Sequence, residues 1–285
     1  MLCGINRSMK ILDGKKIAEE ILGDLKNKIS ADNLHPGLGV VLAGSDEASK
    51  IYVSLKGKAA EKVGIDFRKI EMLENASEEE VLAEIEKLNN DSKIHGIIVQ
   101  LPLPKHLDKI KIIQAIDAKK DVDGFHDENI ELFFAGKERF FPVFPKALLE
   151  LLKSTGEKLE NKKAIIICNS QEFGKTMQAA LKTEKISSQY FFQDDVQDGL
   201  VDLQEADILI TACGKPNLIS GEALKDGVTI IDGGITWVGD KVVGDVNFAS
   251  VQNLSGFLSP VPGGVGPVTI ACLLQNVVEA TKNSF

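Results

Sequence analysis

Apolar residues follow two patterns along this chain: short apolar runs, and longer segments in which they recur every three or four positions. Up to residue 118 the two patterns alternate. They predict strands and helices in turn, with one helix opening at a capping box, Ser77 and Glu80. The expected strands are 38–44, 67–72 and 96–101, and the other expected helices are 14–29, 47–63 and 109–118. This alternation is typical of a parallel sheet covered on both faces.

A second alternation follows a polar stretch and two prolines, Pro142 and Pro145. It predicts helices at 146–154, 173–181 and 268–282, and strands at 164–168, 188–192, 207–211 and 228–232. We therefore expect a two-domain α/β fold. The first domain covers residues 9–125 and the second 140–267, and a C-terminal helix, 268–285, packs back on the first domain.

The composition narrows the function. With 42 acidic and 33 basic side chains, the formal net charge of −9 argues against a nucleic acid or an anionic membrane as partner. Four cysteines far apart in the sequence argue against a disulfide framework or a zinc site and favour a reducing cytoplasm. No apolar run approaches the ~20 residues that span a bilayer. Residues 1–8 lack the apolar core of a signal peptide. From the segment "MKILDGKKIAEEIL" we expect Met9 to be a more natural start than Met1.

Several polar residues could carry chemistry. Tyr52 and Lys56 stand four apart on one predicted helix and share a face. They are either a half-buried tyrosine beside a solvated lysine, or a desolvated lysine able to act as acid or base. Gln100, in "VQLPLP", ends a buried strand and either caps local backbone or presents its amide to a ligand.

Two further segments have unusual composition. In "KDVDGFH", Asp121 and Asp123 lie near His126, but with no further acidic ligand they make a weak metal site, so we expect no metal. The segment "VPGGVGPVT", 261–269, is rich in proline and glycine. It is either a tight interdomain turn or a place where backbone approaches a flat ligand.

The segment "IIICNSQEFGKTM", 165–177, passes from a buried strand through a polar turn into a helix. This is the position of the glycine-rich turn of a Rossmann-like dinucleotide-binding domain, which normally holds two or three glycines. Here only Gly174 remains. Ligands of open α/β sheets bind beyond the carboxyl ends of the strands. That rule selects 44–56, "VQLPLP", 168–174 and 232–235 as candidate binding segments.

Taken in order, these segments resemble the bifunctional methylenetetrahydrofolate dehydrogenase/methenyltetrahydrofolate cyclohydrolase family. The resemblance extends from Met9 to the final helix and rests on "YVSLK" after "GSDEAS", "GIIVQLPLP", "DVDGFH", "KVVGDV" and "PVPGGVGP". It implies a folate site in an interdomain cleft. The implied chemistry is hydride transfer from 5,10-methylenetetrahydrofolate to NADP, followed by hydrolysis of the methenyl product to 10-formyltetrahydrofolate. It also implies a cytoplasmic homodimer that serves one-carbon metabolism and purine biosynthesis.

The resemblance assigns roles to residues. Lys56 would be the central catalytic residue of the hydrolysis, supported by Tyr52 and Gln100, and Asp123 would hydrogen-bond the pterin ring. The implied substrate-binding residues are Tyr52, Val99, Gln100, Leu101, Asp123, Pro262, Gly263, Gly264, Val265 and Gly266. The implied cofactor-binding residues are Cys168, Asn169, Ser170, Gly174, Ile235 and Thr269.

The chain departs from the family in three places, all in or beside the expected cofactor domain. The family usually has G-[RA]-S-x-x-V-G-x-P, P-C-T-P-x-G and V-G-I-N-R. The corresponding segments here are "CNSQEFGKT" (168–176), "PVFPKA" (142–147) and "IDGGITW" (231–237). The folate side matches the family pattern.

These departures bear on the cofactor. An arginine at the position of Asn169 can pair with the 2′-phosphate of NADP, and that charge is absent here. Asp194 and Asp195 follow the next strand, where carboxylates suit a ribose hydroxyl. Cys168 adds a side chain where backbone should approach the pyrophosphate. We therefore predict weak NADP binding with little discrimination against NAD.

Two other functions stay open. One is a monofunctional cyclohydrolase whose cofactor domain survives as a scaffold, and the other is a folate-binding protein without turnover. The presence of Tyr52, Lys56, Gln100 and Asp123 argues against the second alternative.

Overall fold

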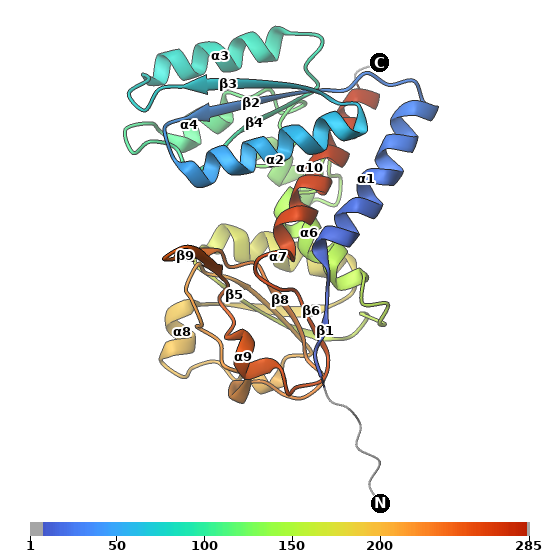
Figure 1. Ribbon diagram of the computed structural model, residues 1–285, viewed down its shortest axis with the longest axis vertical. Helices are drawn as coiled ribbons and strands as arrows, with labels where there is room; N and C mark the ends of the chain where they lie inside the picture. Colours follow the sequence, from blue (N-terminus) through green and yellow to red (C-terminus); the bar gives the residue numbers. More distant parts are fainter. Residues whose placement is uncertain (1–7, 284–285) are drawn as a thin grey trace, which may run out of the picture. The chain divides into compact units, whose positions relative to one another are not determined.

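The computed structural model describes residues 8–283, so the expected N-terminal extension, apart from Ser8, lies outside the described residues (Figure 1). The chain divides into two compact units. The N-terminal unit holds residues 18–143 and the chain from Ile270 onward, and the C-terminal unit holds residues 144–269 and the chain up to Ile17.

The N-terminal unit is built on a three-stranded parallel sheet of order β3-β2-β4. The strands are β2 (Gly37–Ala43), β3 (Asp66–Met72) and β4 (Gly96–Val99). The helices of this part of the chain are α1 (Gly14–Ala31), α2 (Glu47–Val63), α3 (Glu78–Asn90), α4 (Lys109–Gln114) and α5 (Asp127–Phe134). Apolar side chains of α3 and α4 pack with those of β2 and β4 in one buried cluster. All seven residues of β2 are buried, which explains its continuous apolar sequence.

Capping residues fix several helix ends. Asp46 accepts the backbone N–H of Ser49 at the start of α2, and Gly64 ends that helix with a φ of 88°. Ser77 and Glu80 form the predicted capping box of α3. Helix α5 was not predicted, because its eight residues contain only a short apolar pattern.

The C-terminal unit contains a six-stranded sheet of order β1-β11-β8-β7-β5-β6, and every strand pair in it is parallel. Its strands are β1 (Lys10–Ile11), β5 (Lys163–Cys168), β6 (Ser187–Phe192), β7 (Ile208–Ala212), β8 (Thr229–Asp232) and β11 (Phe257–Leu258). An antiparallel pair, β9 (Thr236–Val238) and β10 (Lys241–Val243), stands apart from this sheet. The helices are α6 (Val143–Lys153), α7 (Gln171–Thr183), α8 (Gln193–Gln197) and α9 (Phe248–Val251).

The chain order within this sheet matters for ligand binding. Strand β5 lies between β6 and β7, so successive connections leave it in opposite directions. This is the topological switch point at which open α/β sheets bind dinucleotides. The pairing of β1 with β11 was not anticipated: it joins residues 10–11 to this sheet, whereas the sequence-based boundaries grouped them with the first domain. A strand of two residues carries too little pattern to be recognised.

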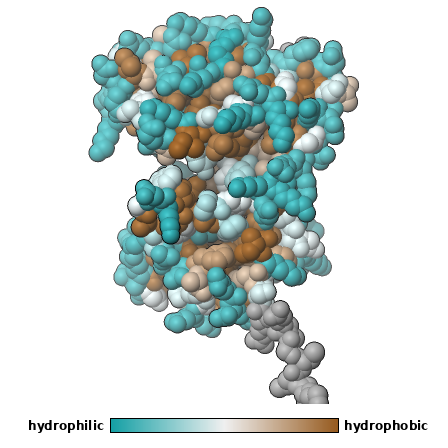
Figure 2. All heavy atoms as spheres, viewed as in Figure 1, coloured by the Kyte–Doolittle hydropathy of each residue, from teal (hydrophilic) through white to brown (hydrophobic). Residues whose placement is uncertain are grey.

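The final helix, α10 (Val265–Lys282), returns to the N-terminal unit as expected. Asn276 Nδ2 donates to the carbonyl oxygens of Val122 and Phe141, both at 2.9 Å, and Lys282 forms an ion pair with Asp32. The helix begins three residues earlier than predicted, since Pro267 is tolerated within a first turn. Among the helices of residues 8–283, none is both long and apolar enough to cross a membrane. Hydrophilic side chains cover much of the face seen in Figure 2.

Candidate active site

Lys56 and Gln100 form a hydrogen-bonded pair in the N-terminal unit. Lys56 lies on α2, and its Nζ donates to Oε1 of Gln100 at 2.9 Å. The Gln100 side chain donates from Nε2 to the carbonyl oxygen of Leu101 at 2.7 Å. The backbone N–H of Gln100 donates to the carbonyl oxygen of Val41 at 2.9 Å. The amide of Gln100 is therefore held at the end of β4, after the buried Val99, with its oxygen directed at the lysine.

Burial sets the electrostatics of the two α2 side chains. Desolvation lowers the pKa of Lys56, and the nearby charge of Asp123 opposes that shift. Burial raises the pKa of Tyr52, so its hydroxyl stays protonated and can donate a hydrogen bond at neutral pH. Of the two interpretations of this pair, the structure favours the desolvated lysine over the solvated one.

Asp123 lies in a turn that Asp121 holds in shape. The Asp121 carboxylate is buried and accepts the backbone N–H of His126 at 2.8 Å and Nδ2 of Asn129 at 2.9 Å. Asn129 also donates to the carbonyl oxygen of Ala118 at 2.8 Å. The Asp121 oxygens thus serve the turn, which carries Asp123 at its centre.

His126 has a local role in the same turn. Its Nδ1 accepts the backbone N–H of Glu128 at 3.1 Å and so caps α5. Among residues 8–283, no group of three or more histidine, cysteine, aspartate or glutamate side chains is arranged to hold a metal ion. The polar groups of this segment are engaged in shaping the backbone around Asp123.

Asp123 is a weaker acid than an exposed aspartate, because it keeps its proton to a higher pH. Burial raises the pKa of Asp123 to about 6, the positive charge of Lys56 limits that rise, and Asp121 adds to it. At neutral pH the carboxylate is therefore mostly ionised. Because its pKa lies near neutral pH, a change in its surroundings can change its protonation state. A desolvated lysine and a partly desolvated carboxylate in one place are typical of a functional site.

The proline- and glycine-rich segment belongs to the C-terminal unit. Gly263 has a φ of 102°, which favours glycine. A Cβ on Gly264 would lie 2.6 Å from the carbonyl oxygen of Pro260, and one on Gly14 would lie 1.8 Å from that of Gly264. The tight-turn interpretation therefore accounts for these glycines. Val265 and Gly266 already form the first turn of α10. A contact of Pro262–Gly266 with substrate stays a prediction.

The predicted dinucleotide turn lies at the switch point of the second sheet. Ser170 caps α7, because its Oγ accepts the backbone N–H of Phe173 at 3.2 Å. Asn169 follows the end of β5, and its Nδ2 donates to the carbonyl oxygen of Cys213, just after β7, at 3.2 Å. The amide of Asn169 thus bridges the ends of the two strands where a dinucleotide is expected.

Gly174 is needed for packing. A Cβ at this position would lie 2.6 Å from Cγ of Tyr190, so the absent side chain lets α7 approach β6 closely. This is the task of the third glycine of the dinucleotide fingerprint. The glycine that the family pattern places at the position of Cys168 is the one that this chain lacks.

The expected obstruction by Cys168 is corrected by the structure. Its side chain is fully buried, and its Sγ lies 3.3 Å from the carbonyl oxygen of Ser170 and 3.7 Å from that of Phe191. Burial raises the pKa of this thiol. The sulfur lies within the protein and adds no bulk to the surface of the turn.

The remaining cofactor candidates differ in exposure. Asp195 accepts the backbone N–H of Phe192 at 2.7 Å and so caps α8, while Asp194 is exposed. Ile235 is 47% exposed just before β9, and Thr269 donates its hydroxyl to the carbonyl oxygen of Val265 within α10. Their contact with a cofactor stays a prediction.

Two buried carboxylates were missed from the sequence. Asp232 accepts the backbone N–H groups of Gly234, Asp245 and Val246, and burial raises its pKa to about 6. Asp245 accepts those of Cys213 and Lys215, both at 2.7 Å. Together they hold the loops beyond β7 and β8. The signal was present, since each aspartate adjoins apolar residues and a glycine in "IDGG" and "VGDV".

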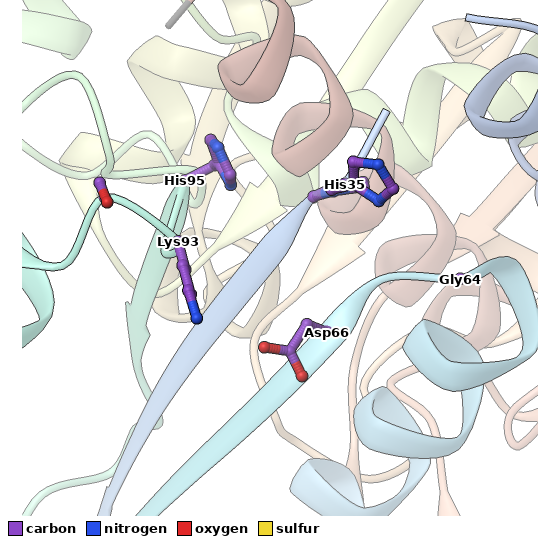
Figure 3. A pocket seen from close by; sticks show the side chains of 7 residues that line it. His35, Gly64, Asp66, Lys93 and His95 are labelled. Atoms are coloured by element: carbon purple, nitrogen blue, oxygen red, sulfur yellow. The ribbon is translucent and has the colours of Figure 1, made fainter. Parts of the chain in front are cut away.

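A hollow in the N-terminal unit lies at the opposite end of the three-stranded sheet from Gln100. Figure 3 shows His35, Gly64, Asp66, Lys93 and His95 around it, near the starts of β2, β3 and β4. His95 Nδ1 accepts the backbone N–H of Gly37 there at 3.1 Å. Because ligands of such sheets bind at the carboxyl ends of the strands, this hollow is not part of the candidate site.

Known proteins similar to this chain include several bifunctional FolD proteins. The curated bifunctional protein FolD of Moorella thermoacetica is 44% identical over 96% of this chain and 99% of its own length. The FolD protein of Listeria innocua is 42% identical, covering 96% of this chain and 97% of the relative. The crystal structure of the bifunctional FolD enzyme of Campylobacter jejuni superposes with a TM-score of 0.90 at 38% identity, covering 98% of this chain and all of that chain.

A second structure adds a ligand to the comparison. The Trypanosoma brucei methylenetetrahydrofolate dehydrogenase-cyclohydrolase, complexed with NADP and an inhibitor, superposes with a TM-score of 0.92 at 30% identity over 97% of this chain and 98% of that one. Two family profiles also match: the catalytic domain of tetrahydrofolate dehydrogenase/cyclohydrolase at residues 12–123, and its NAD(P)-binding domain at residues 142–285. These matches confirm the resemblance read from the sequence, and the chain belongs to the tetrahydrofolate dehydrogenase/cyclohydrolase family.

Proposed function

We propose that this protein oxidises 5,10-methylenetetrahydrofolate with NADP and hydrolyses the resulting 5,10-methenyltetrahydrofolate to 10-formyltetrahydrofolate. One observation carries the proposal: a buried lysine, Lys56, is held on the amide oxygen of Gln100 and lies near the carboxylate of Asp123. The family membership of both halves of the chain supports it.

The hydrolytic step follows from the lowered pKa of Lys56. The methenyl carbon is cationic, and water that attacks it must lose a proton. The neutral form of Lys56 accepts that proton and returns it to the departing nitrogen as the C–N bond breaks. The hydroxyl of the intermediate loses its proton to solvent as the formyl C=O bond forms, so the overall reaction releases one proton. Burial increases the neutral fraction, and Gln100 fixes the direction of the Nζ.

Asp123 and Tyr52 position the substrate. An ionised Asp123 accepts two hydrogen bonds from the amidine-like edge of the pterin. The hydroxyl of Tyr52 is protonated at neutral pH, because burial raises its pKa, and it can donate to substrate. Val99 and Leu101 flank Gln100 and line the same strand end.

The C-terminal unit fits a dinucleotide at its switch point. The start of α7, with its Ser170 cap, offers backbone N–H groups to a pyrophosphate, and the close packing at Gly174 has the form that the fingerprint requires. NADP, when bound, supplies the hydride acceptor. Asn169 carries no charge for the 2′-phosphate, so this chain binds that group through weaker contacts.

We also propose a homodimer in the cytoplasm. The exposed apolar side chains of Trp237 and Val238 on β9 support a surface that a second chain covers. The buried thiols Cys168 and Cys213 suit a reducing compartment.

Two separate assays test the function. Reduction of NADP in the presence of methylenetetrahydrofolate measures the first step, and loss of methenyltetrahydrofolate without cofactor measures the second. Both activities support the proposal. Hydrolysis alone establishes the monofunctional alternative, and binding of a folate analogue without turnover establishes the non-catalytic one.

A further inference from the structure

Three residues that depart from the family pattern meet in the C-terminal unit. Phe144 comes from α6, Phe173 from the first turn of α7, and Gly233 from the residue after β8. The two phenyl rings have centroids 5.3 Å apart and planes at 43°. A Cβ on Gly233 would lie 2.9 Å from Cζ of Phe144 and 2.9 Å from the carbonyl oxygen of Thr211. The ring of Phe144 thus occupies the space that a side chain at 233 needs.

The position of this cluster relates it to one half of a dinucleotide. In a doubly wound sheet the first helix faces the pyrophosphate, and the end of the following strand faces the adenine ribose. Here those elements are α7 and β6. Gly233 follows β8, on the other side of β5 from β6, and its N–H donates to Thr211 at the end of β7. The cluster therefore lies on the side that receives the nicotinamide half.

We propose that Phe144, Phe173 and Gly233 form one packing unit that shapes the nicotinamide half of the dinucleotide site. The two rings are partly exposed, and they present an aromatic wall to that half of the cofactor. This inference rests on the proposed function, because it assumes that the unit binds a dinucleotide.

The unit compensates for what the other end of the site lacks. Asn169 supplies no charge for a 2′-phosphate, so every ligand that carries this phosphate loses the same contact at the adenine end. Aromatic contacts at the nicotinamide end are common to NADP and NAD. Binding therefore depends more on the shared half than on the half that distinguishes the two cofactors.

Calorimetry with NADP, NAD and 2′,5′-ADP tests this assignment, since the last ligand lacks the nicotinamide half. Phe144→Leu and Phe173→Leu should each weaken NADP and NAD about fivefold or more and leave 2′,5′-ADP unchanged. Phe257→Leu is the matched control. It changes the same residue type in the same unit, but Phe257 lies on β11 and pairs with Thr229 at the amino end of β8. If Phe144→Leu fails to fold, Phe173→Leu still decides the question.

The outcomes separate the two proposals. Wild-type protein that binds neither dinucleotide overturns the proposed cofactor function itself. Wild-type protein that binds them while both leucine variants bind as tightly as the Phe257→Leu control overturns only the present inference. Equal weakening of 2′,5′-ADP also overturns it, because the cluster would then act on the adenine half.

A second measurement tests the packing unit without cofactor. Gly233→Ala should lower the melting temperature, because its Cβ meets the ring of Phe144. The same change in a Phe144→Ala background should lower it less, since only the contact with Thr211 remains. An equal loss in both backgrounds would show that Phe144 does not determine the residue at 233.

Discussion

The region around Lys56, proposed for hydrolysis, and the region around Asn169, proposed for cofactor binding, use their polar side chains differently. In the N-terminal unit, Gln100 is fixed by backbone partners in a way that leaves its oxygen on Lys56, and Asp121 shapes a turn that leaves Asp123 available. In the C-terminal unit, Asn169 gives its amide to a neighbouring strand end. Polar groups therefore support a reactive residue in the first region and satisfy the protein's own backbone in the second. From this comparison we expect the residues proposed for hydrolysis to be held ready for reaction, and the binding of the cofactor 2′-phosphate to be weaker.

The largest effect is expected from removing the reactive amine. Lys56→Met keeps the aliphatic stem and deletes the titratable group, so methenyl hydrolysis should fall at least ~10²-fold, the lower range of acid–base contributions. Lys50→Met on the same helix removes a surface ion pair with Glu47 and should change little. Hydrolysis near the wild-type rate in the Lys56 variant would remove this residue from the mechanism.

Loss of the pterin acceptor should have the next largest effect. Asp123→Ala leaves donors of the pterin without partners, which costs roughly 1–3 kcal/mol, or about 5- to 150-fold in the affinity of a folate analogue. Asp66→Ala, at the exposed start of β3, is the control. Chelators should leave activity unchanged. Activity that disappears on chelation and returns with a divalent metal would contradict the pterin role.

The raised pKa of Asp123 predicts a pH dependence that the wild-type protein can show. As the pH falls through about 6 the carboxylate takes up a proton, and analogue affinity should fall by as much as tenfold per unit. Asp123→Asn should bind more weakly and lose this dependence. An affinity that stays constant from pH 7 to pH 5 would show that the ionised form is not required.

The contribution of two buried carboxylates to folding stability should change in the opposite direction over the same range. Asp123 and Asp232 both have folded pKa values of about 6, above the unfolded value of 3.8. The folded state therefore binds more protons between these values, and the stability that the two groups contribute is fully present below 3.8 and lost as the pH rises through 6. Weaker binding at pH 5 would thus not reflect unfolding caused by these groups. Thermal melts of the wild-type protein and of Asp123→Asn at each pH measure the contribution of Asp123.

The smallest effect concerns the one glycine kept in the cofactor turn. Gly174→Ala places a Cβ against the Tyr190 ring and should destabilise the protein by roughly 1–3 kcal/mol. Gly23→Ala, on an open face of α1, should instead stabilise it by up to about 1 kcal/mol. Denaturant unfolding of both variants measures the difference. An unchanged midpoint for Gly174→Ala would show that this glycine is not kept for packing.

Local signals allowed much of the fold to be predicted. Helix α2 was predicted at its observed bounds, 47–63, and the structure shows Asp46 and Gly64 as its caps. Both sheets were predicted from apolar strands between helices. The pairing of β1 with β11 and the short helix α5 were missed, since the first depends on residues far apart in the chain and the second on a cap, His126, whose role only the folded turn reveals.

The candidate site was predictable to a similar depth. The spacing of Tyr52 and Lys56 gave a shared helix face, but the desolvation that makes the lysine reactive comes from the folded surroundings. The contact of Phe144 with Phe173 and the buried direction of the Cys168 thiol also depend on tertiary packing. Sequence patterns identify candidate residues. Which of their polar atoms are hydrogen-bonded within the protein, and which remain available to a ligand, depends on the fold.

The dissociation constants of NADP and NAD for the wild-type protein test the central comparison most directly. The missing cation at Asn169 removes a charge-assisted contact worth ~1.5–3 kcal/mol, roughly ten- to a hundred-fold in affinity. Calorimetry should therefore give weak NADP binding and similar constants for the two cofactors. Micromolar NADP binding with a strong preference over NAD would show that other residues hold the 2′-phosphate, and that the cofactor region is not altered in the way described.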